Sequence, residues 1–320
     1  MKQLFADLHC DTITELYDRV QKGSNETMRA GSLQIDFEKL AEAGSLLQNF
    51  AVFLDKAKWT KDLYKEAMLR IDFFQKQLSD NGDIIRQVTS FEEIAKNEKE
   101  NRISALLTLE GGEILEGKVD NLAAFHEKGV RMITLTWNYD NAFGHCHLNK
   151  EGKGLTRLGF ELVERMEDVH IIPDVSHGSD KLFFDVCKAA KKPFVASHSN
   201  ARSVYGCTRN MNDEMIRALA ERGGLMGMNF FAGFTSKKSS EDGMCYMDDI
   251  IAHMKHVVKV GGIECLGLGS DFDGIGTDVE WGDAGGMRTL LDSMKKAGFT
   301  ERECGKICRE NVLRLYKECL

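Results

Sequence analysis

His9 and Asp11 stand two residues apart at the end of an apolar run near the start of the sequence. Side chains of a β-strand alternate between its two faces, so the imidazole and the carboxylate should point the same way while Cys10 points to the opposite side. An imidazole and a carboxylate at this spacing can bind one metal ion together. The pair gains weight because similar residues end several later apolar segments.

Five of eight predicted strands end with residues that can bind a metal ion or transfer a proton. These residues are His9 with Asp11, Glu110, His177 after Asp174, His198, and Asp271 with Asp273. Asp, Glu and His side chains are rarely buried without partners, so core packing is a poor explanation for their convergence on one edge. Two imidazoles, a His–Asp pair and a glutamate suit zinc or a similar divalent ion.

Five ligands exceed what one tetrahedral site with an open position needs, and they fit two ions if Glu110 bridges them. Two ions about 3.5–4 Å apart can ionise a shared water and polarise a carbonyl together. The pattern therefore predicts hydrolysis of an amide, an ester or a phosphoester. The pattern alone leaves open whether Asp271 or Asp273 faces the site, because the two are one alternation apart.

Eight short apolar segments separated by helical patterns must position these residues. The predicted strands are 3–10, 47–54, 103–109, 130–136, 169–175, 193–197, 224–229 and 265–270, and the predicted helices are 61–79, a helix capped by Ser90 and Glu93, 120–128, 156–167, 179–190, 211–222, 246–260, 284–297 and 300–318. This alternation predicts an α/β fold, a (β/α)8 TIM barrel formed as one domain over 1–320, with a loop-rich insertion near 20–45. Active sites of such barrels lie at the C-terminal ends of the strands.

The remaining histidines and two aspartates are expected to support the structure. We predict structural roles for His126 and His170 and surface positions for His253 and His256. Asp7 and Asp174 are expected to support the neighbouring strand ends. His145 and His147, in the loop after the fourth strand, are ambiguous, and an ordinary loop role is favoured for both.

The candidate residues belong to motifs that follow one another in a fixed order. The motifs are His9-x-Asp11, Glu110-Gly111-Gly112, Asp174-Val175-Ser176-His177, Ser197-His198-Ser199, Ser203-Val204, Arg209-Asn210 and the segment 267–274. From residue 3 to residue 311 this set resembles the membrane (renal) dipeptidase family of zinc peptidases, peptidase family M19. The resemblance implies a distorted TIM barrel with two zinc ions that cleaves dipeptides, often with a D-residue on the C-terminal side.

The resemblance also implies a role for each site residue. His9 and Asp11 would bind the first zinc ion, His177 and His198 the second, and Glu110 would bridge the two. Arg209 would bind the C-terminal carboxylate of the substrate in a bidentate contact. Asp271 would contact the substrate α-amino group and assist proton transfer while a hydroxide held between the metals attacks the carbonyl.

Trp137 departs from the family pattern. Animal members carry a histidine after the Leu-Thr of the fourth strand, where it binds the substrate carbonyl and stabilises the oxyanion, but this sequence has Leu135-Thr136-Trp137. The indole cannot act as an acid, although its N–H can donate a hydrogen bond to a substrate. His145 or His147 is the alternative source of this function.

Two other functions compete with a dipeptidase. Another amidohydrolase-type hydrolase, such as an N-acyl-amino-acid deacylase, a lactonase or a deaminase, would also use a binuclear site. Many of those begin with His-x-His and bridge with a carbamylated lysine, so His-x-Asp and a glutamate favour the dipeptidase. A non-catalytic metal- or peptide-binding protein is disfavoured because all five ligand positions are intact.

Composition predicts a cytoplasmic protein whose partner is a small molecule, a dipeptide. The net charge of −8 and the pI near 5.7 argue against nucleic acid and anionic membranes. The sequence shows no signal-peptide pattern, no apolar run long enough to cross a membrane, and no counterpart of the lipid-anchor tail of animal relatives. Nine scattered cysteines without a CxxC pair suit a reducing compartment. Homodimers are common in the resembling family, which raises a homodimer as one assembly.

Overall fold

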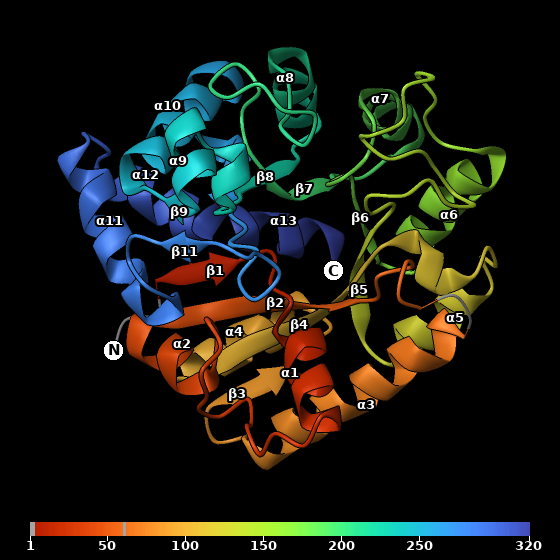
Figure 1. Ribbon diagram of the computed structural model, residues 1–320, viewed down its shortest axis with the longest axis horizontal. Coiled ribbons are helices and arrows are strands. Elements are labelled where there is room, and N and C mark those ends of the chain that lie inside the picture. The colour runs from red at the N-terminus through yellow and green to blue at the C-terminus, as the bar shows by residue number, and fades with distance from the viewer. Residues whose placement is uncertain (1–3, 60–61) are drawn as a thin grey trace.

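A closed barrel of eight parallel strands lies at the centre of the molecule, with helices around it (Figure 1). The structure, a computed structural model, describes residues 4–59 and 62–320. The barrel strands in order are β1 (Phe5–Asp7), β2 (Ser45–Phe53), β4 (Ile103–Glu110), β5 (Val130–Thr134), β6 (Ile172–Asp174), β7 (Val195–Ser199), β8 (Leu225–Met228) and β10 (Leu266–Leu268). β10 pairs with β1 and closes the barrel, which confirms the predicted fold class.

Helices connect these strands, as the alternating pattern predicts. Their bounds are α1 (Thr12–Gln21), α2 (Phe37–Ala43), α3 (Leu63–Asp80), α4 (Phe91–Lys99), α5 (Asn121–Glu127), α6 (Arg157–Asp168), α7 (Asp180–Ala189), α8 (Asp213–Glu221), α9 (Lys237–Asp242), α10 (Met247–Gly261), α11 (Met287–Lys296), α12 (Glu301–Gly305) and α13 (Asn311–Cys319). A π-helical segment, Lys306–Glu310, joins α12 to α13. The predicted helix over 300–318 is therefore continuous but not uniformly α-helical.

Several short elements lie outside the prediction. β3 (Ile85–Gln87) pairs with β4, while β9 (Met244–Cys245) and β11 (Asp278–Val279) pair with each other. Unlike the equally short β1, β6 and β10, these strands do not lie within a longer apolar run, so the sequence does not mark them. The predicted loop-rich insertion near 20–45 contains the short helix α2. The first residue of the predicted strand 3–10 and of the predicted helix 61–79 lies outside the described residues.

The alternation of β4 shows how the barrel aims side chains at the site. Ala105, Leu107 and Leu109 pack outward in the main hydrophobic core under the helices, whereas Leu106 belongs to the separate core inside the barrel. Since successive residues of a strand face opposite sides, Glu110 falls on the inward face with Leu106. The last residue of the strand thus points into the barrel at its C-terminal end.

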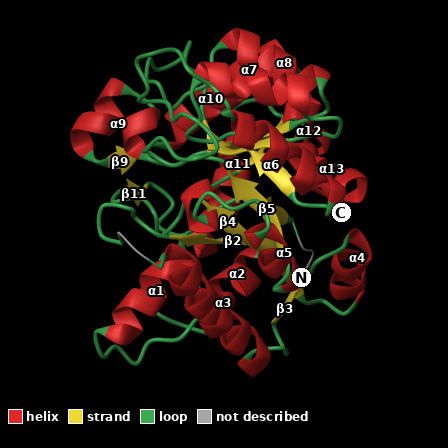
Figure 2. Cartoon of the chain, turned by 90° about the vertical axis from the view of Figure 1, so that its right-hand side faces the viewer, coloured by secondary structure: helices red, strands yellow, loops and turns green. Residues whose placement is uncertain are grey.

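The opposite end of the barrel is closed by α13. Val312, Leu315 and Tyr316 of this helix pack against inward-facing strand residues, and the Tyr316 hydroxyl donates a hydrogen bond of 2.8 Å to Asn49 Oδ1. Figure 2 shows α4 and the C-terminus on one side of the strands, and β9, β11 and α1 on the other. One end of the barrel is therefore packed for stability, and the other is left to loops.

Two joints of the barrel rest on few backbone pairs. The backbone partners are Asp7 with Leu268 and, just beyond the strands, Cys10 with Phe272 between β1 and β10, and Asp174 with Val195 between β6 and β7. By contrast, β2 pairs with β4 along 47–53. Side chains reinforce both joints, because Asp7 accepts a hydrogen bond from the N–H of Ser270 and Asp174 accepts one from the N–H of Ser197, both at 2.9 Å. The expected supporting roles of Asp7 and Asp174 are confirmed.

Within residues 4–59 and 62–320, no helix has both the length and the apolar character needed to cross a bilayer.

Candidate active site

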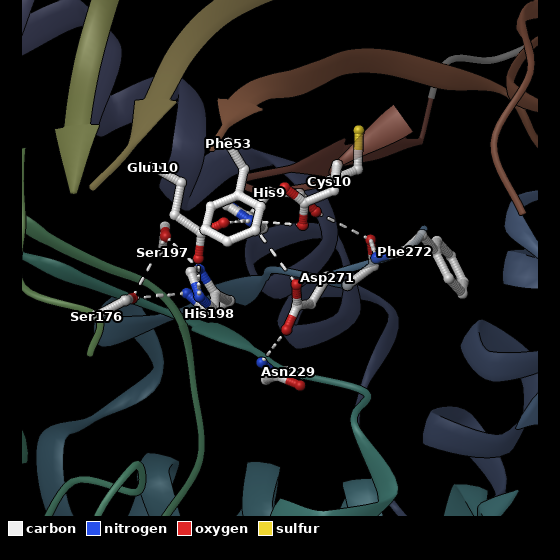
Figure 3. A network of polar contacts seen from close by, with 12 residues as sticks. His9, Cys10, Phe53, Glu110, Ser176, Ser197, His198, Asn229, Asp271 and Phe272 are labelled. Atoms are coloured by element: carbon white, nitrogen blue, oxygen red, sulfur yellow. Dashed lines mark hydrogen bonds and ion pairs between the residues drawn. The ribbon is translucent and has the colours of Figure 1, made fainter. Parts of the chain in front are cut away.

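Six side chains that can bind a metal ion converge at the C-terminal end of the barrel. They are His9, Asp11, Glu110, His177, His198 and Asp271, four of which are labelled in Figure 3. His9 Nε2 lies 3.3 Å from Asp11 Oδ2 and 3.7 Å from Asp271 Oδ1. The structure thus brings together all five predicted metal ligands, with Asp271 beside them.

Glu110 lies at the centre of this cluster. Its Oε1 atom is 3.0 Å from His177 Nε2 and 3.4 Å from His198 Nε2, while Oε2 is 3.6 Å from His9 Nε2. The residue is 3 % exposed. A buried carboxylate with one oxygen toward each group of imidazoles is arranged as a bridging ligand would be.

His9 and Asp11 are held beyond the end of β1 rather than within it. The regular strand stops at Asp7, whose carboxylate accepts a hydrogen bond from the His9 N–H, and Asp11 is the residue before helix α1. The two side chains nevertheless share one face as predicted. Cys10 points away from them and donates through its thiol to the Asn49 carbonyl.

A chain of hydrogen bonds fixes the imidazole of His198. Ser197 Oγ donates to Asp174 Oδ2 at 2.6 Å and lies 2.8 Å from His198 Nδ1 (Ser197 and His198 in Figure 3). Because the Ser197 proton is directed to the carboxylate, the hydroxyl oxygen accepts the proton of Nδ1. The lone pair of His198 Nε2 therefore faces Glu110, as a metal ligand requires.

His177 is held by a different partner, Asn138, in the loop after β5. His177 Nδ1 lies 2.8 Å from Asn138 Oδ1, and His147 Nε2 lies 3.0 Å from the same oxygen. His147 therefore reaches the site indirectly, behind Asn138. His145 does not reach it, because its Nδ1 contacts the carbonyl of Gly154.

The structure separates the functions of Asp271 and Asp273. Asp273 accepts hydrogen bonds from Thr12 Oγ1 and from the N–H groups of Gln34 and Ile35, so it anchors the insertion to the barrel rim. Asp271 Oδ1 faces His9, and its Oδ2 accepts a hydrogen bond of 2.8 Å from Asn229 Nδ2. Of the two carboxylates left open by the sequence pattern, Asp271 is the one beside the predicted metal ligands.

Arg209 lies beside the backbone of His198. Its Nη2 donates to the His198 carbonyl at 3.0 Å, and the side chain is buried with its Nε unpartnered. In the part of the chain that the structure describes, no carboxylate forms an ion pair with this guanidinium. Its closest aromatic contact is Phe234, whose ring centre is 5.3 Å away. Phe234 lines the cavity described next, whereas Arg209 itself does not.

A cavity of about 390 Å³ opens beside the cluster. Its wall includes Glu110, His177 and Asp271, and also Trp137 and Asn138 from the loop after β5. The Trp137 ring packs against Phe53 with ring centres 4.6 Å apart. Trp137 therefore lies in the wall of the cavity.

Burial and crowding shift the pKa values of the acidic groups upward. Burial, with the nearby Asp11 carboxylate, raises the pKa of Glu110 to about 8. Burial and Asp11 likewise raise the pKa of Asp271 to about 7, against the opposing effect of His9. Although burial alone would lower it, the pKa of His9 is well above its usual value because the Glu110 and Asp11 carboxylates surround it. The site thus concentrates negative charge that a cation would relieve.

The donor set fits divalent metal ions. His177 Nε2 and His198 Nε2 lie 2.9 Å apart with Glu110 Oε1 close to both, and the buried Asp11 Oδ1 has no hydrogen-bond partner. Burial and the nearby Arg209 charge hold the pKa values of both imidazoles well below the usual value, so they are neutral ligands at pH 7. Imidazole nitrogens and carboxylate oxygens in this combination are zinc ligands.

Two amides that hold site residues were not predicted from the sequence, and one histidine lies elsewhere than predicted. Asn138 and Asn229 orient His177 and Asp271, but neither belongs to a residue type or motif that marks a site by itself. His253 is buried, contrary to the predicted surface position. It accepts a hydrogen bond from the Ala201 N–H, because α10 packs beneath the loop that carries Arg209.

The sequence also matches known proteins. The profile of the membrane dipeptidase family, peptidase family M19, matches residues 1–319. A protein encoded in the pqqA 5′ region of Klebsiella pneumoniae is 32% identical over 227 residues, which cover 68% of this chain and 83% of that protein. Dipeptidase 3 of Rattus norvegicus is 26% identical over 292 residues, covering 89% of this chain and 58% of that protein.

Two solved structures share the fold. A metallopeptidase from Rhodobacter sphaeroides bound to a phosphinate mimic of L-Ala-D-Ala superposes with a TM-score of 0.90 at 23% identity over the full length of both chains. The dipeptidase AC, of family M19, superposes with a TM-score of 0.89 at 24% identity over 99% of this chain and 98% of that one. Because the family profile covers nearly all of the sequence, this chain belongs to the membrane dipeptidase family, peptidase family M19.

Proposed function

We propose that this metal-dependent dipeptidase works with two zinc ions and recognises both charged ends of a dipeptide. His9 and Asp11 would hold the first ion, His177 and His198 the second, and Glu110 would lie between them. The proposal extends to dipeptides with a D-residue at the C-terminal position, as the family resemblance implies. It also assigns the chain to one domain, a small-molecule substrate and the cytoplasm.

The unpaired guanidinium of Arg209 is the observation that carries this proposal. A buried cation without a counter-ion is costly, and an anionic ligand would relieve that cost. The ligand carboxylate would be held at Arg209, beside the His198 backbone, and the ammonium group at Asp271, whose Oδ1 lies toward His9. A substrate with a carboxylate at one end and an ammonium group at the other matches this arrangement. Only a short peptide would satisfy both charges.

The chain's own groups have distinct tasks in this reaction. When bound, the metal ions would lower the pKa of a water molecule and polarise the scissile carbonyl. Asp271 would receive the proton lost by that water and pass it to the leaving amine, since a carboxyl with a pKa near 7 can hold and release a proton at neutral pH. Asn229 keeps Asp271 turned toward His9. Trp137 and Phe53 form an apolar wall of the cavity that limits water access.

Hydrolysis of a small substrate panel on protein of known zinc content tests the proposal. The panel consists of L-Ala-L-Ala, L-Ala-D-Ala, trialanine, N-acetylalanine and a simple lactone. We expect about two zinc ions per chain and cleavage of the two dipeptides. Trialanine should react far more slowly, because one of its charged ends cannot reach its partner. Glu110→Gln is the matched inactive control, because it preserves shape but removes the bridging charge.

The panel also identifies the competing activities. Turnover of N-acetylalanine or the lactone with no dipeptide cleavage would place the chain among deacylases or lactonases and reject the proposed substrate. Trialanine cleaved as fast as dialanine would refute recognition of both charged ends. Two bound zinc ions without turnover of any substrate would leave a binding protein.

A further inference from the structure

Hydrolysis of a peptide bond develops negative charge on the scissile carbonyl oxygen, and a preorganised N–H donor stabilises that charge. Three side chains of the cavity wall could supply free N–H protons: Lys58, Trp137 and Asn138. Lys58 lies on an exposed turn, and the Trp137 ring is held by aromatic packing alone. Asn138 differs from both because hydrogen bonds to two imidazoles fix its carboxamide.

We propose that Asn138 is a catalytic residue whose amide Nδ2 donates to the scissile carbonyl oxygen, and that His147 locks the amide in this orientation. The proposal rests on the proposed dipeptidase function and assigns the group that stabilises the oxyanion. It also accounts for the tryptophan at position 137, because the adjacent amide supplies the donor instead.

The two imidazoles determine which end of the carboxamide faces the cavity. His177 Nε2 must keep its lone pair toward Glu110 and His198, so the His177 proton is on Nδ1 and points to Asn138 at 2.8 Å. A donor on the imidazole requires an acceptor on the amide, so the amide oxygen faces His177. The Nδ2 group then projects to the other side.

His147 supplies the second bond to the same oxygen. Its Nε2 lies 3.0 Å from Asn138 Oδ1, and its Nδ1 accepts a hydrogen bond of 2.7 Å from the Thr208 hydroxyl. The His147 backbone N–H also donates to the His177 carbonyl at 2.7 Å. Both lone pairs of the amide oxygen are therefore occupied, and His147 is itself held by Thr208 through its ring and by His177 through its backbone.

The Nδ2 protons remain available to a ligand. Asn138 lines the cavity beside His177 and Glu110, and within residues 4–59 and 62–320 no acceptor bonds its Nδ2. The two hydrogen bonds on Oδ1 also polarise the amide, which strengthens its N–H groups as donors. A fixed donor in the wall of the cavity that Glu110 and His177 also line can donate to the carbonyl oxygen of a substrate bound there.

Two substitutions at position 138 separate the Nδ2 donor from the Oδ1 acceptor that bonds His177 and His147. Asn138→Asp keeps an oxygen acceptor for both imidazoles but removes the N–H donor, and Asn138→Ala removes both. Loss of one oxyanion donor costs about 10²–10³ in kcat, so we expect kcat for L-Ala-L-Ala to fall by about that factor in both variants at saturating zinc. KM should change little, because the donor acts mainly in the transition state. Asn101→Asp, an exposed change of the same type, controls for the added charge.

Zinc affinity measured by chelator competition tests the hydrogen bond between Asn138 Oδ1 and His177 without relying on activity. Loss of a hydrogen bond to a metal-bound histidine lowers metal affinity by about 10–100-fold, so Asn138→Ala should bind zinc that much more weakly while Asn138→Asp should not. His147→Ala should lower kcat less than Asn138→Ala does, because one bond to the amide oxygen remains.

The proposal is overturned if Asn138→Ala, saturated with zinc, keeps a kcat within threefold of the unmodified protein. It is also overturned if Trp137→Phe reproduces the full loss, since the indole would then be the donor. If the unmodified protein cleaves no dipeptide, the proposed function fails instead. The zinc-affinity comparison still tests whether Asn138 positions His177 in that case.

Discussion

Arg209 is a buried cation that forms no ion pair within the described residues. The sequence pattern alone does not mark it, because an arginine in a loop has no periodicity, and only the family resemblance pointed to it. His9, Glu110 and His198 could be predicted from residue type and position, since ligand residues at the ends of strands meet on one rim. The role of Asn138 could not be predicted, because it depends on the contacts of its loop with His177 and His147 in the folded chain.

Arg209→Met tests carboxylate recognition. This substitution keeps the length of the side chain and removes its charge, so we expect KM for L-Ala-L-Ala to rise by about 10–100-fold, the value of one or two charged hydrogen bonds. The free energy of unfolding without substrate should not decrease, because an unpaired buried charge is removed. Steady-state kinetics and urea unfolding measure the two effects.

Lys58→Met provides a comparison for this experiment, because Lys58 is an exposed cation on the same cavity. An equal rise of KM in both variants would attribute recognition to the general positive charge of the cavity. An unchanged KM in Arg209→Met would remove Arg209 from substrate binding.

At the scale of elements, all eight barrel strands could be predicted because each is an apolar run followed by polar residues. Helix α1 was missed, since its β-branched residues Thr12, Ile13 and Thr14 have low helix propensity. The helix is stabilised by the burial of Ile13 and Leu16 rather than by helix propensity. Helix α2 did carry recognisable signals. Asp36 caps it by accepting from the Lys39 N–H, and Gly44 ends it in the left-handed region.

The turn after Asp271 packs directly on a predicted metal ligand. A Cβ atom added at Gly274 would lie 2.0 Å from Asp11 Oδ2, whereas one added at Gly276 would have no neighbour within 4 Å. We expect Gly274→Ala to displace Asp11 and to weaken zinc binding by about 10–100-fold. Chelator competition measures this loss, and Gly276→Ala is the matched control. Equal zinc affinity in both variants would mean that the turn does not hold Asp11.

At the scale of the whole molecule, protons and metal ions compete for one site. In the metal-free protein the pKa values of Glu110 and Asp271 are about 8 and 7, above those of the unfolded chain. Between pH 6.5 and 8 the folded state therefore holds protons that the unfolded state has lost, and stability falls as pH rises. The slope is about 1.4 kcal/mol per pH unit for each such proton.

Thermal unfolding with zinc and with a chelator measures this competition. We expect the Tm of the chelated protein to fall from pH 6.5 to 8, and the difference between the zinc-loaded and chelated proteins to grow over the same range, because zinc needs the deprotonated carboxylates. A constant difference would indicate that these carboxylates do not exchange protons for metal.

The single-domain organisation and the cytoplasmic location stay predictions.

The two sparsely paired joints of the barrel have a consequence for its motions. They separate β7, β8 and β10 from the other five barrel strands, and the candidate ligands are divided between the halves. His177 stands on one side of the β6–β7 joint and His198 on the other. A metal ion held by both would act as a cross-link across the β6–β7 joint. Without the ion, we expect the strand pairing there to open locally.

Amide hydrogen exchange measures local opening at the two joints. Opening at these joints would let the amides of β6, β7 and β10 exchange by local unfolding well below the global unfolding free energy, while the extensively paired β2 and β4 would exchange only on global unfolding. We expect zinc to slow exchange in the first group far more than in the second. Uniform slowing would mean that the barrel opens as one unit. Selective slowing would mean that bound zinc stabilises the contact between the two groups of barrel strands.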